Sequence, residues 1–194
     1  MTLQCGLIHG GKAYLWTDTL AYGGDHKTPL FHVTKTFHDA TRKWTGIISG
    51  DLPPDNLHMV PQAIADAEPK TERQLVDAVI AAVKASHGMG YAARFLFAFP
   101  CADRGARMFM VASEDLPFTC AFRAHELVQY ASHGGDQLLR PCDPKTPVDM
   151  MRYIAWTKKL PSPHPLGGDL IQTEIGMDGM QQRRWSDYFE RVPA

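Results

Sequence analysis

The chain begins with two short stretches of strand-forming residues that a pair of glycines separates. Residues 1–8 and 14–18 flank Gly10 and Gly11. Two adjacent glycines favour a tight hairpin turn, because such a turn needs positive φ angles, which residues without Cβ adopt at no steric cost. We therefore expect an N-terminal β-hairpin that folds Asp18 back beside the first residues of the chain.

The expected hairpin brings Asp18 close to Thr2, whose own groups could take part in a reaction. If Met1 is removed, Thr2 carries a hydroxyl and a free α-amine on one residue. The amine has an ordinary pKa of about 7.7–8, so it can take up the hydroxyl proton near neutral pH. The sequence thus predicts Thr2 as a candidate nucleophile, with Asp18 close by.

Length and composition narrow the class of protein. The 194 residues suffice for one domain, 1–194, and 44% of them are hydrophobic. A net charge of −1 without a basic block argues against nucleic-acid binding. No apolar run reaches the roughly 18 residues that span a membrane. The four cysteines lack C-x-x-C spacing, and no export signal precedes them, so we expect a cytoplasmic protein.

Hydrophobic periodicity predicts strands, then two helices, strands, one helix and a closing hairpin. Thr71 and Gln74 form a capping box, and Pro61 is expected to kink or divide the helix around it. This order indicates an α+β protein with paired antiparallel sheets. The expected strands are 31–37, 44–50, 94–99, 107–112, 118–122, 126–132, 170–175 and 180–185, and the expected helices are 51–68, 71–86 and 146–159.

Lys35 stands out within the expected strand 31–37. It lies on the same alternating face as Phe31, Val33 and Phe37. A lysine that points into a core needs a partner for its ammonium group. The alternative is a mixed face on which Lys35 is solvated.

Several short motifs, taken in order, resemble one known superfamily. They are Thr2, Thr17-Asp18, and the ranges 33–35, 46–51, 106–113, 131–135 and 167–171. Their order and spacing resemble the N-terminal-nucleophile (Ntn) hydrolases, specifically proteasome β-type subunits and HslV-like peptidases. The resemblance implies a four-layer αββα sandwich in which two antiparallel sheets lie between helix layers. It also implies a homo-oligomeric ring that cleaves peptide or amide bonds, with an ATPase as a further partner.

The resemblance assigns a role to each matching residue. Thr2 would be the nucleophile and its own amine the base. Lys35 would lower the pKa values of that amine and hydroxyl, and Asp18 would hold Lys35. The Gly50 N–H would stabilise the oxyanion, and Ser132 would orient the terminus. No cofactor or metal is implied.

Two departures support an alternative function. The superfamily usually has an aspartate in the loop that matches 162–166, and this chain has none there. The region 136–147 contains Pro141, Pro144 and Pro147, which shorten the helix expected after Ser132. The alternative is therefore a catalytically inactive subunit that keeps the architecture for a structural or assembly role.

Two other sets of residues could carry chemistry. His26, His32 and His38 are spaced six apart, which is wider than a zinc site favours, so loop or surface positions explain them better. Cys5 would be the nucleophile if the chain were cleaved after Gln4, but this places Asp18 at the wrong spacing. A buried strand cysteine is the simpler interpretation.

Overall fold

The strands of the protein form two large antiparallel sheets. The computed structural model describes residues 3–22, 28–39, 41, 43–53, 56–133, 136–137, 144–157 and 166–189. Within these residues, one sheet has six strands and a second has five. The six-stranded sheet has the order β11 (Asp136–Gln137), β10 (Gln129–His133), β1 (Leu3–His9), β2 (Lys12–Asp18), β12 (Leu170–Gly176) and β13 (Gly179–Trp185).

The five-stranded sheet lies against the first and carries most of the phenylalanines. Its three central strands, residues 45–50, 93–101 and 105–112, are almost wholly buried. Burial on both faces explains why the second and third of them are near-continuous apolar runs in the sequence. Its strand order is β5 (Thr36–His38), β6 (Thr45–Gly50), β7 (Ala93–Cys101), β8 (Gly105–Ala112) and β9 (His125–Glu126).

A hydrophobic core fills the space between the two sheets. Leu15 of β2, Ile47 of β6, Leu96 of β7 and Met108 of β8 are each at most 1% exposed and belong to one packed cluster. Alternate residues of each strand point into this core, and the others point to the outer faces. The two outer faces therefore need covers of their own.

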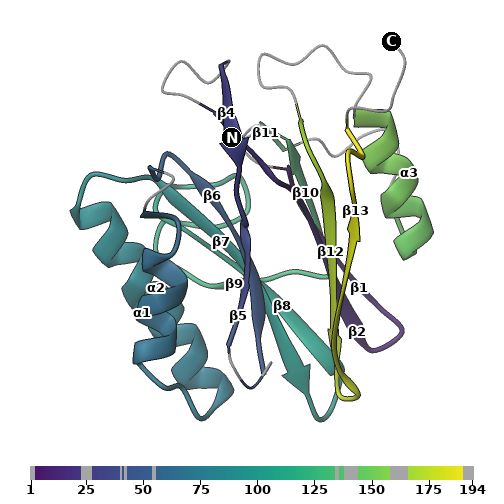
Figure 1. Ribbon diagram of the computed structural model, residues 1–194. Coiled ribbons are helices and arrows are strands. Elements are labelled where there is room, and N and C mark those ends of the chain that lie inside the picture. The colour runs from purple at the N-terminus through teal and green to yellow at the C-terminus, as the bar shows by residue number, and fades with distance from the viewer. Residues whose placement is uncertain are drawn as a thin grey trace.

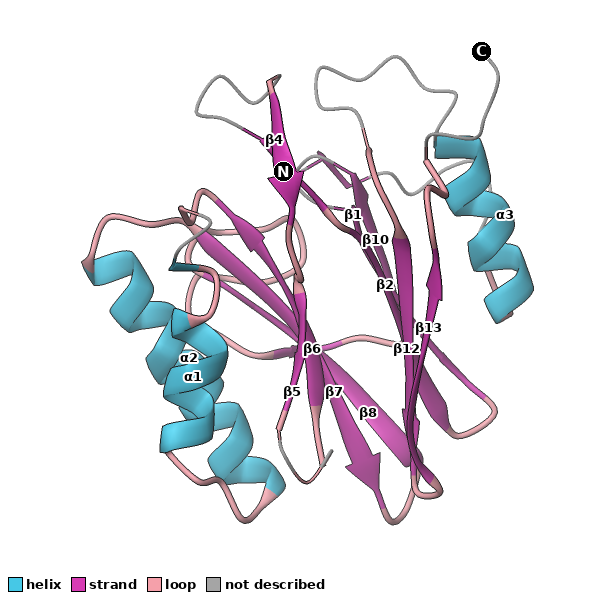
Figure 2. Ribbon diagram, in the orientation of Figure 1, coloured by secondary structure: helices cyan, strands magenta, loops and turns pink. Residues whose placement is uncertain are grey.

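Helices supply these covers, as Figures 1 and 2 show. The helices α1 (Met59–Asp66) and α2 (Glu72–Gly88) pack on the outer face of the five-stranded sheet. The single helix α3 (Pro147–Thr157) packs its buried residues Met150 and Tyr153 against β1 and β2 of the other sheet. Among the described residues, no helix is long and apolar enough to cross a membrane.

A third, small sheet lies at the end of the molecule where Asp18 is found. It pairs β3 (Leu20–Tyr22) with β4 (Pro29–His32) and has a register shift between Ala21 and Tyr22. The chain leaves β2 at Asp18 and, after β4, enters the five-stranded sheet at β5. This small sheet therefore connects the two large ones.

The predicted four-layer αββα sandwich is wrong. The described part of the chain forms three antiparallel sheets rather than two, and strands predominate over its three helices. One helix lies against the six-stranded sheet where a helix layer was expected. The physical reason for the extra sheet is that the stretch 31–37 does not form one strand, because Val33–Lys35 carries the chain from one sheet to another.

Local predictions had mixed outcomes. The N-terminal and C-terminal hairpins and the Thr71 capping box are confirmed. Pro61 neither kinks nor divides α1, because it lies in the first turn, where its missing N–H has no helical acceptor to lose. The stretch 126–132 is divided between β9 and β10 in different sheets, and 118–122 forms turns with an isolated bridge rather than a strand.

Candidate active site

Three chain segments meet at the candidate site. Leu3 is the first residue of β1, Asp18 is the last residue of β2, and Lys35 immediately precedes β5. The side chain of Asp18 is fully buried, and Lys35 is 3% exposed. The structure thus places Lys35 in the interior and excludes the solvated alternative.

One carboxylate oxygen joins these segments. Asp18 Oδ1 accepts a hydrogen bond from Lys35 Nζ at 2.9 Å and another from the Leu3 backbone N–H at 2.9 Å. Lys35 Nζ also donates to the Leu20 carbonyl at 2.7 Å. The predicted contact between Asp18 and Lys35 is confirmed, and it lies next to the start of β1.

The other carboxylate oxygen has no hydrogen-bond partner among the described residues. Asp18 Oδ2 is buried and accepts no hydrogen bond from any residue that the structure describes. Leaving such an acceptor without a donor costs about 1–3 kcal/mol or more, so native proteins rarely do so. Asp18 Oδ2 can therefore accept a hydrogen bond from one further donor. Thr2, the residue before Leu3 in the sequence, lies outside the described residues.

Burial sets the electrostatics of the pair. Desolvation lowers the pKa of Lys35 from its ordinary value, while the charge and hydrogen bond of Asp18 oppose this shift by favouring the ammonium form. A positive charge held in a dry environment acts strongly on neighbouring groups, because little water screens it. An amine or hydroxyl that lies closer to the Lys35 ammonium than to the Asp18 carboxylate would lose its proton more readily.

Gly50 ends β6 in a conformation that other residues rarely adopt. Its φ angle is 138°, and a Cβ atom at this position would lie 2.1 Å from the carbonyl oxygen of Ala92. Any side chain would therefore collide with the backbone of the neighbouring strand. The glycine is required by local structure, whatever its chemical role.

The direction of the Gly50 N–H follows from the sheet pattern. Ile48 N–H donates to the Lys35 carbonyl at 3.1 Å, whereas Asp51 N–H donates to the Ala92 carbonyl at 3.0 Å on the opposite side. Amides two residues apart on a strand point the same way. The Gly50 N–H therefore points to the side of β6 on which Lys35 lies, as an oxyanion donor of this site requires.

Ser132 lies on β10, on the far side of β1 from Asp18. It is paired with Gln4 and is 4% exposed. Because Cα partners on neighbouring strands share a face of the sheet, Ser132 and Gln4 face the same way. Ser132 is thus close in register to the start of β1, but no contact joins it to Asp18 or Lys35 among the described residues.

Gln4 is a buried polar residue that sequence reasoning missed. It is 1% exposed and hydrogen-bonds the backbone carbonyl of Ile47 and the hydroxyl of Ser49, both on β6. Its signal was present in the sequence, since Gln4 is the one strongly polar side chain between Leu3 and Ile8.

Cys5 is a poor alternative nucleophile. Its side chain is fully buried, and burial raises the pKa of its thiol to about 12. The thiolate is the nucleophilic form, so a thiol that remains protonated at neutral pH is unreactive. Cys5 instead packs with the core beneath α3.

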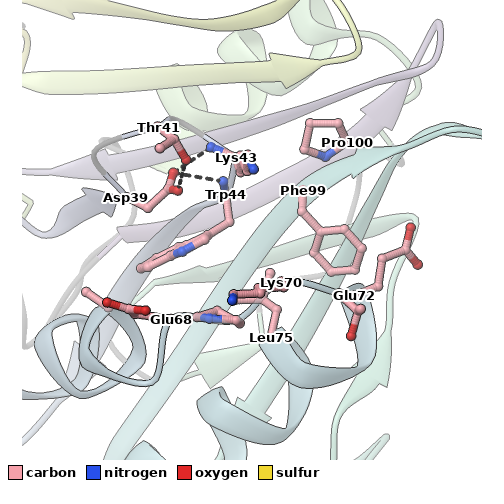
Figure 3. A pocket seen from close by; sticks show the side chains of 13 residues that line it. Asp39, Thr41, Lys43, Trp44, Glu68, Lys70, Glu72, Leu75, Phe99 and Pro100 are labelled. Carbon is pink, nitrogen blue, oxygen red and sulfur yellow. Dashed lines mark hydrogen bonds between the residues drawn. The ribbon is translucent and has the colours of Figure 1, made fainter.

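Figure 3 shows a pocket at the end of β6 that is opposite Gly50. It has a volume of about 560 Å³, and Trp44, Leu75 and Phe99 form its apolar part. Trp44 precedes the first residue of β6, whereas Gly50 is the last, so the pocket is separate from the candidate site. The carboxylate of Asp39, at its rim, accepts the Lys43 and Trp44 backbone N–H groups and is occupied by its own loop.

The described residues contain no group of three or more His, Cys, Asp and Glu side chains placed to hold a metal. His32 instead lies 3.0 Å from the Thr19 hydroxyl. His26, one of the three evenly spaced histidines, lies outside the described residues. So do residues 162–165 of the loop 162–166, in which the superfamily usually has an aspartate.

Comparisons with known proteins assign no family to the chain. A scan against models of protein families gives no match. A search of curated protein sequences gives none either.

Proposed function

We propose that the protein is an N-terminal threonine hydrolase that cleaves peptide or amide bonds. The observation that carries this proposal is Asp18 Oδ1, which binds both the Leu3 N–H and the buried ammonium of Lys35. This arrangement ties a cation of lowered pKa to the residue that follows Thr2 in the chain. Asp18 Oδ2, which accepts no hydrogen bond from the residues that the structure describes, can accept one from a further donor at the same place.

The chemistry assigned to the site needs one nucleophile and one base. After removal of Met1, the Thr2 amine takes the proton of the Thr2 hydroxyl, whose oxygen attacks the substrate carbonyl and forms a C–O bond. The Gly50 N–H binds the resulting oxyanion. The proton then passes to the departing amine as the C–N bond breaks, and water hydrolyses the ester that remains. Lys35 favours the deprotonated nucleophile, and Asp18 holds Lys35 in place.

The resemblance to proteasome-like peptidases supports the remaining parts of the proposal. These are a homo-oligomeric ring, an ATPase partner, a cytoplasmic location, and no need for a cofactor, a nucleic acid or a membrane. Ser132 would help to orient the terminus from β10. The competing function is a catalytically inactive structural or assembly subunit, which the missing aspartate in 162–166 favours.

Mass spectrometry of the purified protein tests the proposal directly. We expect the intact mass to lack Met1 and a peptide β-lactone to add one acyl group, which peptide mapping locates on Thr2. Thr2→Ala should abolish labelling, because it removes the attacking oxygen. Thr2→Ser should retain labelling at a reduced rate, because it keeps both hydroxyl and amine.

Three results would contradict the proposal. A retained Met1 would leave Thr2 without a free amine. An N-terminus that begins at Thr2 but takes up no label would favour the inactive subunit. Labelling that persists in Thr2→Ala would place the nucleophile elsewhere in the chain.

A further inference from the structure

The side chain of Gln4 forms a buried bridge between the two large sheets. Its amide nitrogen donates to the Ile47 carbonyl at 2.9 Å and to the Arg94 carbonyl at 3.3 Å. Its amide oxygen accepts a hydrogen bond from the Ser49 hydroxyl at 3.2 Å. One side chain of β1 thus contacts both β6 and β7, and it is 1% exposed.

This position would ordinarily hold an apolar residue. Gly6 and Ile8, the next residues of β1 that point the same way, meet Met108 and the core between the sheets. A buried amide is tolerated only when its donors and acceptor are satisfied, and an apolar side chain of similar volume would pack here without this requirement. Gln4 therefore provides directional contacts that packing alone would not.

The two ends of the bridge are close in sequence to the two groups that the proposed reaction needs to align. Gln4 is two residues after Thr2, and Ser49 is one residue before Gly50. We propose that Gln4 is a positioning residue, which fixes the strand that bears the nucleophile relative to the strand that bears the oxyanion donor. This inference rests on the proposed function and assigns Gln4 no contact with substrate.

Loss of the Gln4 amide should lower the rate constant of the reaction strongly and change substrate binding little. A displacement of about 1 Å between reacting groups costs on the order of 10²-fold in rate. Without the amide, no hydrogen bond joins β1 directly to β6 within the described part of the chain. Substrate contacts made by other residues would remain.

Inactivation by the β-lactone measures this effect, because it separates the rate constant of inactivation from the affinity for the inhibitor. In Gln4→Met, which keeps a similar volume, we expect the rate constant to fall on the order of 10²-fold with affinity within about twofold. Ser49→Ala removes one of the three hydrogen bonds and should give a smaller fall. Its direction should be the same.

Thr45→Ala is the matched control. Thr45 is fully buried at the opposite end of β6, and its hydroxyl donates to the Phe37 carbonyl at 3.1 Å. Urea unfolding of Gln4→Met, Ser49→Ala and Thr45→Ala measures the stability that each variant loses. If Gln4→Met slows inactivation no more than Thr45→Ala at equal loss of stability, Gln4 is purely structural and the inference is wrong.

The experiment also separates this inference from the proposed function. A wild-type protein that takes up no label contradicts the proposed function, and with it any nucleophile for Gln4 to position. A wild-type protein and a Gln4→Met variant that react equally fast contradict only the role of Gln4.

Discussion

Neither Asp18 nor Lys35 is stable in the interior without the other. Both side chains are almost fully removed from water, and a lone buried charge costs several kcal/mol. A buried ion pair that serves only stability is often replaceable by apolar residues at no loss. Stability alone therefore does not explain why the pair lies beside the start of β1, and the proposed reaction supplies a reason.

Substitutions at the pair test this interpretation. Lys35→Met should destabilise the fold by about 3–5 kcal/mol, because it leaves the Asp18 carboxylate buried with one backbone donor. The double variant Lys35→Met with Asp18→Asn removes both charges and should recover most of that loss. Urea unfolding measures both values.

The single and double variants should differ in stability but not in activity. Both variants should fail to react with the β-lactone, since each lacks the cation. A double variant that regains stability and also reacts would show that the pair is structural only.

The pair was only partly predictable from the sequence. The glycine turn placed Asp18 beside the chain start, and the alternation of residues 31–37 placed Lys35 on an inward face. Gln4 was missed because a polar residue in an apolar strand reveals no partner until the opposing sheet is known. The placement of Thr2 remains a prediction.

At the scale of elements, two hairpin turns from different sheets touch each other. The β1–β2 turn contains Gly10 and Gly11, and the β7–β8 turn ends at Gly105, whose φ angle is 79°. A Cβ on Gly105 would lie 2.2 Å from the Gly11 carbonyl oxygen. The contact is therefore backbone against backbone, with no space for a side chain.

Alanine substitutions in these turns should differ in cost. Gly10→Ala meets no atom within 4 Å, so it should cost only the left-handed backbone strain of about 1–2 kcal/mol. Gly105→Ala adds a collision and should cost about 1–3 kcal/mol more. Thermal or urea unfolding of the two variants measures the difference. Equal costs would mean that the turns separate freely.

Element boundaries were predictable where signals were local. The capping box at Thr71 and the paired glycines in turns act within a few residues and appear as expected. The stretch 31–37 was misread because period-2 alternation is the same whether one strand continues or two strands join different sheets. Which sheet a strand joins depends on distant residues.

At the scale of the whole molecule, the proposed ring requires surfaces that favour contact between copies. On β4, Leu30 and Phe31 are 51% and 45% exposed, although both are large and apolar. Adjacent exposed apolar side chains of this kind often mark interaction sites. They are compatible with burial between subunits.

Light scattering of the native protein measures its assembly state. We expect a particle with the mass of several 21.6 kDa chains, because closed rings of identical subunits hide such surfaces. Thr2→Ala should give the same mass, since it alters only the proposed nucleophile. A particle of one chain at micromolar concentration would contradict the ring.

The collision that excludes a side chain at Gly50 affects how genetic data on this protein should be read. A saturation mutagenesis screen would score every substitution there as harmful, in an enzyme and in an inert scaffold alike. Intolerance at this codon thus carries no information about catalysis. A backbone amide-to-ester replacement, made by semisynthesis, removes the hydrogen without adding a carbon and isolates the chemical contribution.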